Sequence, residues 1–166
     1  MAEKESVQMD PDSLKLSQAI ELVNGPSPMQ GITILRELVA KDSNNVDAHY
    51  WLGVFSVKSG QLDKAINRFE KVLGLNPQYM PAMIDLGGVY QQMDSSAVAL
   101  GYFTRAKELD TTNNYALLFS AQVQERMGLW KEAKENYEQL LRHNSDTIVA
   151  KRVNEFIENI DHKLNP

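Results

Sequence analysis

The chain has 166 residues, of which 43% are hydrophobic and 23% are charged, a globular composition that excludes a disordered or collagen-like protein. The formal net charge is −5 and the basic residues are scattered, so we expect no dedicated nucleic-acid or anionic-membrane surface. Because the chain has no cysteine, it has no disulfide, zinc–thiolate or iron–sulfur site and no cysteine nucleophile.

The first two predicted helices lie before residue 45. Asp10 can cap a helix over about Pro11 to Val23, and Asn24-Gly25-Pro26 predicts a left-handed stop followed by a helix breaker. Ser27 and Gln30 then have the spacing of a capping box, which predicts the start of the second helix.

The next helices are delimited in the same way. Asn45 precedes the third helix, Gly60 separates it from the fourth, and Pro77 follows the fourth. Gly128 divides the seventh helix from the eighth. Asp94 stands where the third unit lacks a turn glycine, and Asp tolerates the left-handed conformation better than most residues.

A ninth helix is expected after Thr147, and no segment alternates like a strand. Its apolar residues recur at helical spacing: Val149, Val153, Phe156, Ile157 and Ile160. The sequence therefore predicts an all-α fold, and the chain length is that of one domain.

A period of 34 residues relates the helices to one another. The stretch that begins at Val46 restarts at Met80 and again at Asn114, and the same period projected backwards starts a degenerate unit at Asp12. Small or aromatic residues coincide at three positions of this frame, namely Gly53, Gly87 and Ala121; Ala65, Ala99 and Ala133; and Phe69, Phe103 and Tyr137.

The chain thus resembles a tetratricopeptide repeat (TPR) array. The second unit carries Leu52-Gly53, Gly60, Ala65, Phe69 and Pro77 at the offsets typical of the family. The resemblance implies a superhelical solenoid of helix-turn-helix repeats with a C-terminal capping helix. The predicted divisions are a flexible N-terminal segment (1–11), four repeats in 12–147 (12–45 degenerate, 46–79, 80–113 and 114–147), and a capping helix with its tail (148–166).

No group of residues indicates catalysis or a cofactor. His49, His143 and His162 lie in different predicted helices and have no metal-ligand spacing. There is no P-loop, dinucleotide fingerprint or Gly-x-Ser-x-Gly motif. We therefore expect no enzyme, no metal and no cofactor.

The resemblance implies that the first helix of each repeat lines a concave groove. Aromatic residues on that face are typical of recognition rather than of a merely solvated surface. The positions of the family's clamp for acidic C-terminal tails match nowhere in this sequence. The candidate peptide-binding residues are Asp47, Tyr50, Trp51, Val54, Lys58, Ile84, Asp85, Tyr115, Leu118, Phe119, Gln122 and Arg126.

The predicted function is that of a non-catalytic interaction module that binds an extended peptide or a short helix of a partner protein in this groove. Three alternatives remain open: a terminal segment covers the face, a homodimer buries it, or the chain is the soluble part of a larger envelope-tethered assembly protein. No long apolar segment predicts that this chain itself enters a membrane. A cytoplasmic location is expected, or a periplasmic or envelope-tethered one if the chain is a fragment.

Overall fold

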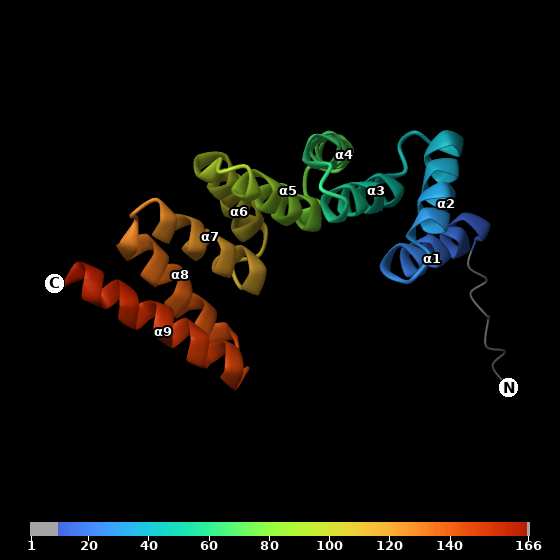
Figure 1. The fold of residues 1–166 in the computed structure, drawn as a ribbon. Coiled ribbons are helices and arrows are strands. Elements are labelled where there is room, and N and C mark those ends of the chain that lie inside the picture. The colour runs from blue at the N-terminus through green and yellow to red at the C-terminus, as the bar shows by residue number, and fades with distance from the viewer. Residues whose placement is uncertain (1–9, 166) are drawn as a thin grey trace, which may run out of the picture. The chain divides into compact units, whose positions relative to one another are not determined.

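The computed structural model describes residues 10–165, and this range forms nine helices and no strand (Figure 1). The helices pack as two compact units that divide between Pro77 and Gln78. This division follows from the architecture, because in a repeat protein each hairpin contacts only its neighbours. Residues 1–9 of the predicted flexible segment lie outside the described residues, whereas Asp10 and Pro11 belong to the cap and first turn of a helix.

Unit 1 consists of two helical hairpins, in which each helix packs against the next. Its helices are α1 (Pro11–Asn24), α2 (Pro28–Lys41), α3 (Val46–Lys58) and α4 (Leu62–Leu75). A core of small and branched side chains joins α1, α2 and α3: Ala19, Val23, Ile32, Leu35, Leu38, Ala48 and Leu52.

Unit 2 contains two further hairpins and a final helix that packs along α8 (Figure 1). Its helices are α5 (Met80–Gln92), α6 (Ser96–Leu109), α7 (Asn114–Arg126), α8 (Trp130–His143) and α9 (Thr147–Leu164). The main core, which α7, α8 and α9 share, comprises Leu117, Ala121, Ala133, Tyr137, Leu140, Val153 and Ile160. The predicted capping helix is therefore present, and Val153 and Ile160 are its buried residues.

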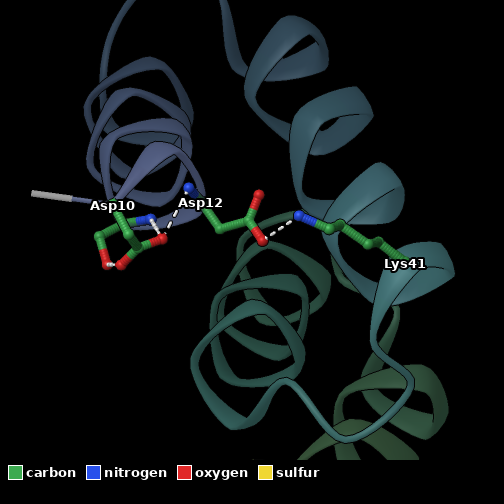
Figure 2. A network of polar contacts seen from close by, with 4 residues as sticks. Asp10, Asp12 and Lys41 are labelled. Atoms are coloured by element: carbon green, nitrogen blue, oxygen red, sulfur yellow. Dashed lines mark hydrogen bonds and ion pairs between the residues drawn. The ribbon is translucent and has the colours of Figure 1, made fainter.

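Side-chain caps begin four of the helices. The Asp10 carboxylate accepts hydrogen bonds from the amides of Asp12 and Ser13, as predicted, and the Asp12 carboxylate forms an ion pair with Lys41 across the first hairpin (Figure 2). Because the cap satisfies amides that the helix leaves unpaired, it fixes the start of α1. The other three caps are Asn45, Asn113 and Asp146.

Two predicted end signals are wrong. The Ser27 side chain makes no capping hydrogen bond, and the amide of Gln30 instead donates to the Ser27 carbonyl. Gly25 has φ −102° rather than a left-handed conformation, and its amide bonds to the Leu22 carbonyl. Pro26 explains the conformation of Gly25, since proline restricts the residue before it to extended conformations. Ser27 has ψ 54° and thus lacks the extended backbone that a capping residue usually has.

The predicted tight turns within the other hairpins are confirmed. Gly60 has φ 71° and Gly128 has φ 74°, and Asp94 occupies the same left-handed region at φ 56°. Because a β-carbon is strained in this region, glycine is the favoured residue and Asp a tolerated one.

The repeated spacing of glycine and phenylalanine reflects close contacts within each hairpin. A β-carbon added at Gly53 would lie 2.6 Å from the Phe69 ring, and one added at Gly87 would lie 2.6 Å from the Phe103 ring. The Phe69 and Phe103 rings thus pack against the glycine of their own hairpin, and Phe103 additionally contacts Phe119 of the next hairpin, with ring centroids 5.5 Å apart.

Candidate interaction surface

The five groove candidates of unit 1 all lie on α3, but their aromatic rings are not freely exposed. Trp51 is half-buried and packs against the core of unit 1. Tyr50, also half-buried, makes an edge contact with Trp51 at 5.5 Å between ring centroids and lies 5.9 Å from the Phe69 ring. Neighbouring side chains therefore cover part of both rings, and a role of these two residues in peptide binding stays a prediction.

The polar candidates of unit 1 lie at the ends of α3. Asp47 is in its first turn, and Lys58 is exposed in its last turn. The Lys58 ammonium donates to the Asn24 side-chain oxygen at 2.6 Å, which connects the ends of α3 and α1. Val54 is half-buried between them.

In unit 2, Tyr115 is the most exposed aromatic candidate. Its side chain is 64% exposed, and its ring stacks on Phe119 with centroids 6.2 Å apart. Phe119 and Ile84 are half-buried and pack against the Ala99, Phe103 and Val123 cluster. Phe119 therefore belongs partly to the core and supports Tyr115 from below.

Arg126 and Asp85 are the charged candidates of unit 2. The Arg126 guanidinium forms an ion pair with Asp94 at 2.7 Å, which ties the end of α7 to the turn before α6. Asp85 is half-buried on α5. Arg126 is therefore held by an ion pair at the end of α7, and Asp85 lies on α5, the first helix of the preceding hairpin.

A groove lies between α7 and α9, which both pack against α8 while their backbones stay apart. It contains an apolar hollow of about 190 Å³ and an adjoining hollow of about 510 Å³, with Gln122 in the wall of both. The smaller hollow is lined by Leu118, Gln122, Val149, Arg152, Val153 and Phe156. The larger one is lined by Gln91, Gln122, Glu125, Arg126, Trp130, Asn159, Ile160 and Lys163.

The contribution of α9 to this groove was missed in the sequence. Val149 and Phe156 were assigned to the face that covers α8, and they do pack against that core. Both residues also line the smaller hollow, together with Arg152 from the same helix. The apolar spacing of residues 149–160 was the available signal, but it does not reveal which edge of the face stays open.

One carboxylate in the groove has a fixed partner. The Tyr137 hydroxyl donates to the Glu125 carboxylate at 2.6 Å. Burial, followed by this hydrogen bond to a charged group, raises the pKa of Tyr137 far above its usual value. The tyrosine therefore stays protonated and holds Glu125 at the wall of the larger hollow.

The described residues present no arrangement for metal-dependent chemistry. In this part of the chain, no three histidine or acidic side chains lie together as metal ligands. His49 is buried in a hydrogen-bond network and His143 ends α8. In the range 10–165, no helix has both the length and the apolar character needed to cross a bilayer.

Sequence profiles described as tetratricopeptide repeat match residues 46–79 and 115–147. Together with the nine helices of the described chain, these matches establish the fold class as an all-α helical-repeat solenoid. Residues 46–79 and 115–147 therefore match tetratricopeptide repeats, which generally mediate protein–protein interactions and are typically not catalytic.

Relatives with curated names are much longer than the part they share with this chain. Human Superkiller complex protein 3 is 26% identical over 144 residues, which cover 85% of this chain and 9% of that protein. The chloroplastic tetratricopeptide repeat domain-containing protein PYG7 of Arabidopsis thaliana is 30% identical over 90 residues, or 54% of this chain and 30% of that protein. The chain thus spans a minor part of these relatives.

Solved structures share the fold at low sequence identity. MamA matches with a TM-score of 0.76 and 22% identity, covering 95% of this chain and 86% of that one. The thermophilic TPR protein TTC0263 of Thermus thermophilus matches with a TM-score of 0.69 and 14% identity, covering 93% and 83%. At these identities the likeness establishes the helical-repeat architecture alone.

Proposed function

We propose that this protein is a non-catalytic interaction module that binds an extended peptide or a short amphipathic helix of a partner protein. The site is the groove between α7 and α9, and we include the exposed ring of Tyr115, near the start of α7, as a further contact of the ligand. The observation that carries the proposal is the apolar hollow that stays open between these two helices although both belong to one packed unit.

The size and lining of the smaller hollow suit a peptide side chain. Its volume of about 190 Å³ is below the roughly 300 to 1,000 Å³ of small-molecule pockets. Leu118, Val149 and Phe156 supply apolar contacts, while Gln122 and Arg152 supply polar groups that can orient a backbone. An apolar anchor surrounded by a few hydrogen-bonding groups is the usual form of a peptide-binding site.

Charges at the groove favour a particular ligand composition. Arg152 borders the smaller hollow and Lys163 the larger, whereas Glu125 is engaged by Tyr137. We therefore expect the ligand to place an apolar side chain in the smaller hollow and an acidic residue near Arg152. This preference differs from that of the family's clamp for acidic C-terminal tails, because the anchor of the groove between α7 and α9 is apolar.

Selection of peptides from a random displayed library against the purified chain tests this proposal. Binding of the selected peptides is then measured by calorimetry for the wild type, Tyr115→Ala and a control, Met29→Ala. Met29 is 62% exposed on α2, so it matches Tyr115 in exposure but lies in the other unit. Tyr115→Ala should weaken binding about 30-fold or more, as expected for a hot-spot aromatic, and Met29→Ala should leave it unchanged.

Two outcomes contradict the proposal. Equal affinity of the Tyr115→Ala and wild-type chains would place the peptide site elsewhere. A dimeric mass by light scattering that Tyr115→Ala converts to a monomeric mass would assign the face to self-association instead.

A further inference from the structure

A second hollow, in unit 1, lies apart from the peptide groove. It has a volume of about 400 Å³ and is bounded by α2 and α4, with α3 beneath. The buried side chains of Ile32 and Leu52 and the half-buried Phe55 form its apolar part. Leu52 and Phe55 lie on a different face of α3 from Trp51 and Val54, so the hollow is separate from the predicted groove.

Four cationic side chains line this hollow, namely Arg36 from α2 and Lys64, Arg68 and Lys71 from α4. Among the described residues, no carboxylate lines this hollow. Burial and then the nearby positive charge of Arg36 lower the pKa of Arg68. Positive charge therefore gathers at one place on a chain whose net charge is −5.

Arg68 is held in position by a neutral partner. Its guanidinium donates to Nδ1 of His49 at 2.8 Å, and the other ring nitrogen of His49 donates to the Ser43 carbonyl at 3.0 Å. Of the five N–H donors of a guanidinium, this arrangement uses one. The remaining donors of Arg68 are left for a ligand, on a side chain that is already oriented.

The two lysines are also paired only with neutral groups. Lys64 donates to the Gln61 side-chain oxygen at 2.5 Å, and Lys71 contacts the Asn44 side-chain oxygen at 3.4 Å. Amide oxygens orient an ammonium group without neutralising it. The charge of the hollow is thus retained in full.

The repeat architecture does not require this charge. The positions equivalent to Arg36 and Arg68 in the next two repeats carry no cation. They are Glu70 and Thr104 for Arg36, and Tyr102 and Asn136 for Arg68. Since the same fold is built there without the arginines, a role in packing does not account for the cluster.

We propose that this hollow binds a doubly charged phosphate group. The planar fork of an arginine matches the oxygens of a phosphate in a bidentate geometry, and lysines add compact positive charge. Four cations suit a dianion better than a single carboxylate, because the Coulomb attraction grows with the ligand's charge. The phosphate comes either from the free anion or from a phosphorylated side chain.

Titration of the ¹⁵N-labelled full-length chain with inorganic phosphate, in phosphate-free buffer at constant ionic strength, tests the site. We expect saturable amide shifts confined to residues around the hollow. Sodium acetate should produce no saturable shift. The Arg36→Gln variant should bind at least tenfold more weakly, and Lys15→Gln, which removes an exposed cation of α1 outside the hollow, should bind like the wild type.

Arg36 was chosen for substitution because it is exposed, so that Arg36→Gln leaves the core of unit 1 intact. The half-buried Arg68 is left unchanged for the same reason. A parallel titration with O-phosphoserine identifies the source: tighter binding than phosphate indicates a phosphorylated side chain, and equal or weaker binding indicates the free anion. Shifts that rise linearly without saturation, an equal response to acetate, or an unchanged affinity of Arg36→Gln would overturn the proposal.

Discussion

Neighbouring glycines on α5 have opposite surroundings. A β-carbon at Gly87 would meet the buried Phe103 ring at 2.6 Å, whereas one at Gly88 would meet no atom within 4 Å. The ring cannot retreat easily, because Phe103 is fully buried between α5 and α7. The first glycine is therefore required by packing, and the second is not.

Alanine substitutions at these two sites should change stability in opposite directions. We expect Gly87→Ala to lower the free energy of unfolding by about 1 to 3 kcal/mol through overpacking. Gly88→Ala should raise it by roughly 0.5 to 1 kcal/mol, since alanine is the better helix former. The measurement is urea unfolding followed by Trp130 fluorescence, and equal midpoints for the two variants would contradict this interpretation of the close contact.

His49 should make the stability of unit 1 depend on pH. Burial, followed by the charges of Arg68 and Lys71, lowers the pKa of His49 below 6.5, although the Ser43 carbonyl and Asp42 act in the opposite direction. The unfolded chain therefore takes up a proton near pH 6.5 that the folded chain takes up only at lower pH. The stabilisation is complete above this pH and is lost as the pH falls below it.

We expect the urea midpoint of unit 1 to fall between about pH 7.5 and 5.5 in the wild type, and this fall to be smaller in His49→Leu. Leucine is the residue at the equivalent position of the fourth repeat, Leu117. As a control, His143→Leu alters an exposed histidine of α8 and should keep the pH dependence. An undiminished fall in His49→Leu would show that other groups cause it.

Side-chain burial at the candidate site was the least predictable feature. Helical periodicity correctly grouped Trp51 with Val54, but the exposure of a ring depends on the size of residues from other helices. Trp51 packs against the core of unit 1, and Phe119 lies on Phe103. Tyr115 stays exposed because its position near the start of α7 lies beyond these neighbours.

At the level of the helices, the local chemistry of the chain predicted most boundaries. Asp10 and Asn45 cap as expected, and the starts of α3, α5 and α7 are spaced by the 34-residue period. The failure at Gly25 occurs before Pro26, where backbone restriction outweighs the preference of glycine for the left-handed region. At Ser27 the backbone has ψ 54° rather than the extended value of a capping residue, which the sequence pattern alone did not indicate.

The last helix offers a test of packing against α8. Phe156 stacks on the buried Tyr137 ring with centroids 5.3 Å apart, whereas Ile148 on the same helix is 75% exposed. We expect Phe156→Ala to cost about 2 to 3 kcal/mol, somewhat less than the loss of a fully buried phenylalanine. Ile148→Ala should stay within about 0.5 kcal/mol of the wild type. Thermal and urea unfolding measure both, and similar losses would show that the stacking adds no stability.

At the scale of the whole molecule, the division into two compact units suggests two cooperative unfolding units. In a repeat protein, stability is approximately the sum of local terms and nearest-neighbour terms, so a perturbation acts mainly on its own neighbourhood. Each unit contains one tryptophan, Trp51 in unit 1 and Trp130 in unit 2, and both are half-buried against the local core. The chain therefore carries one fluorescent reporter for each unit.

Single-tryptophan variants make this division measurable. Trp130→Phe leaves the reporter of unit 1, and Trp51→Phe leaves that of unit 2. We expect different urea midpoints for the two variants, because the cores of the units differ in composition. Adding Gly87→Ala should lower the free energy of unfolding reported by Trp130 and leave that reported by Trp51 within about 0.5 kcal/mol of its value without the substitution, since Gly87 and its partner Phe103 both lie in unit 2. Coincident transitions that Gly87→Ala shifts equally would show instead that the chain unfolds as one cooperative body, and that the packing division has no thermodynamic counterpart.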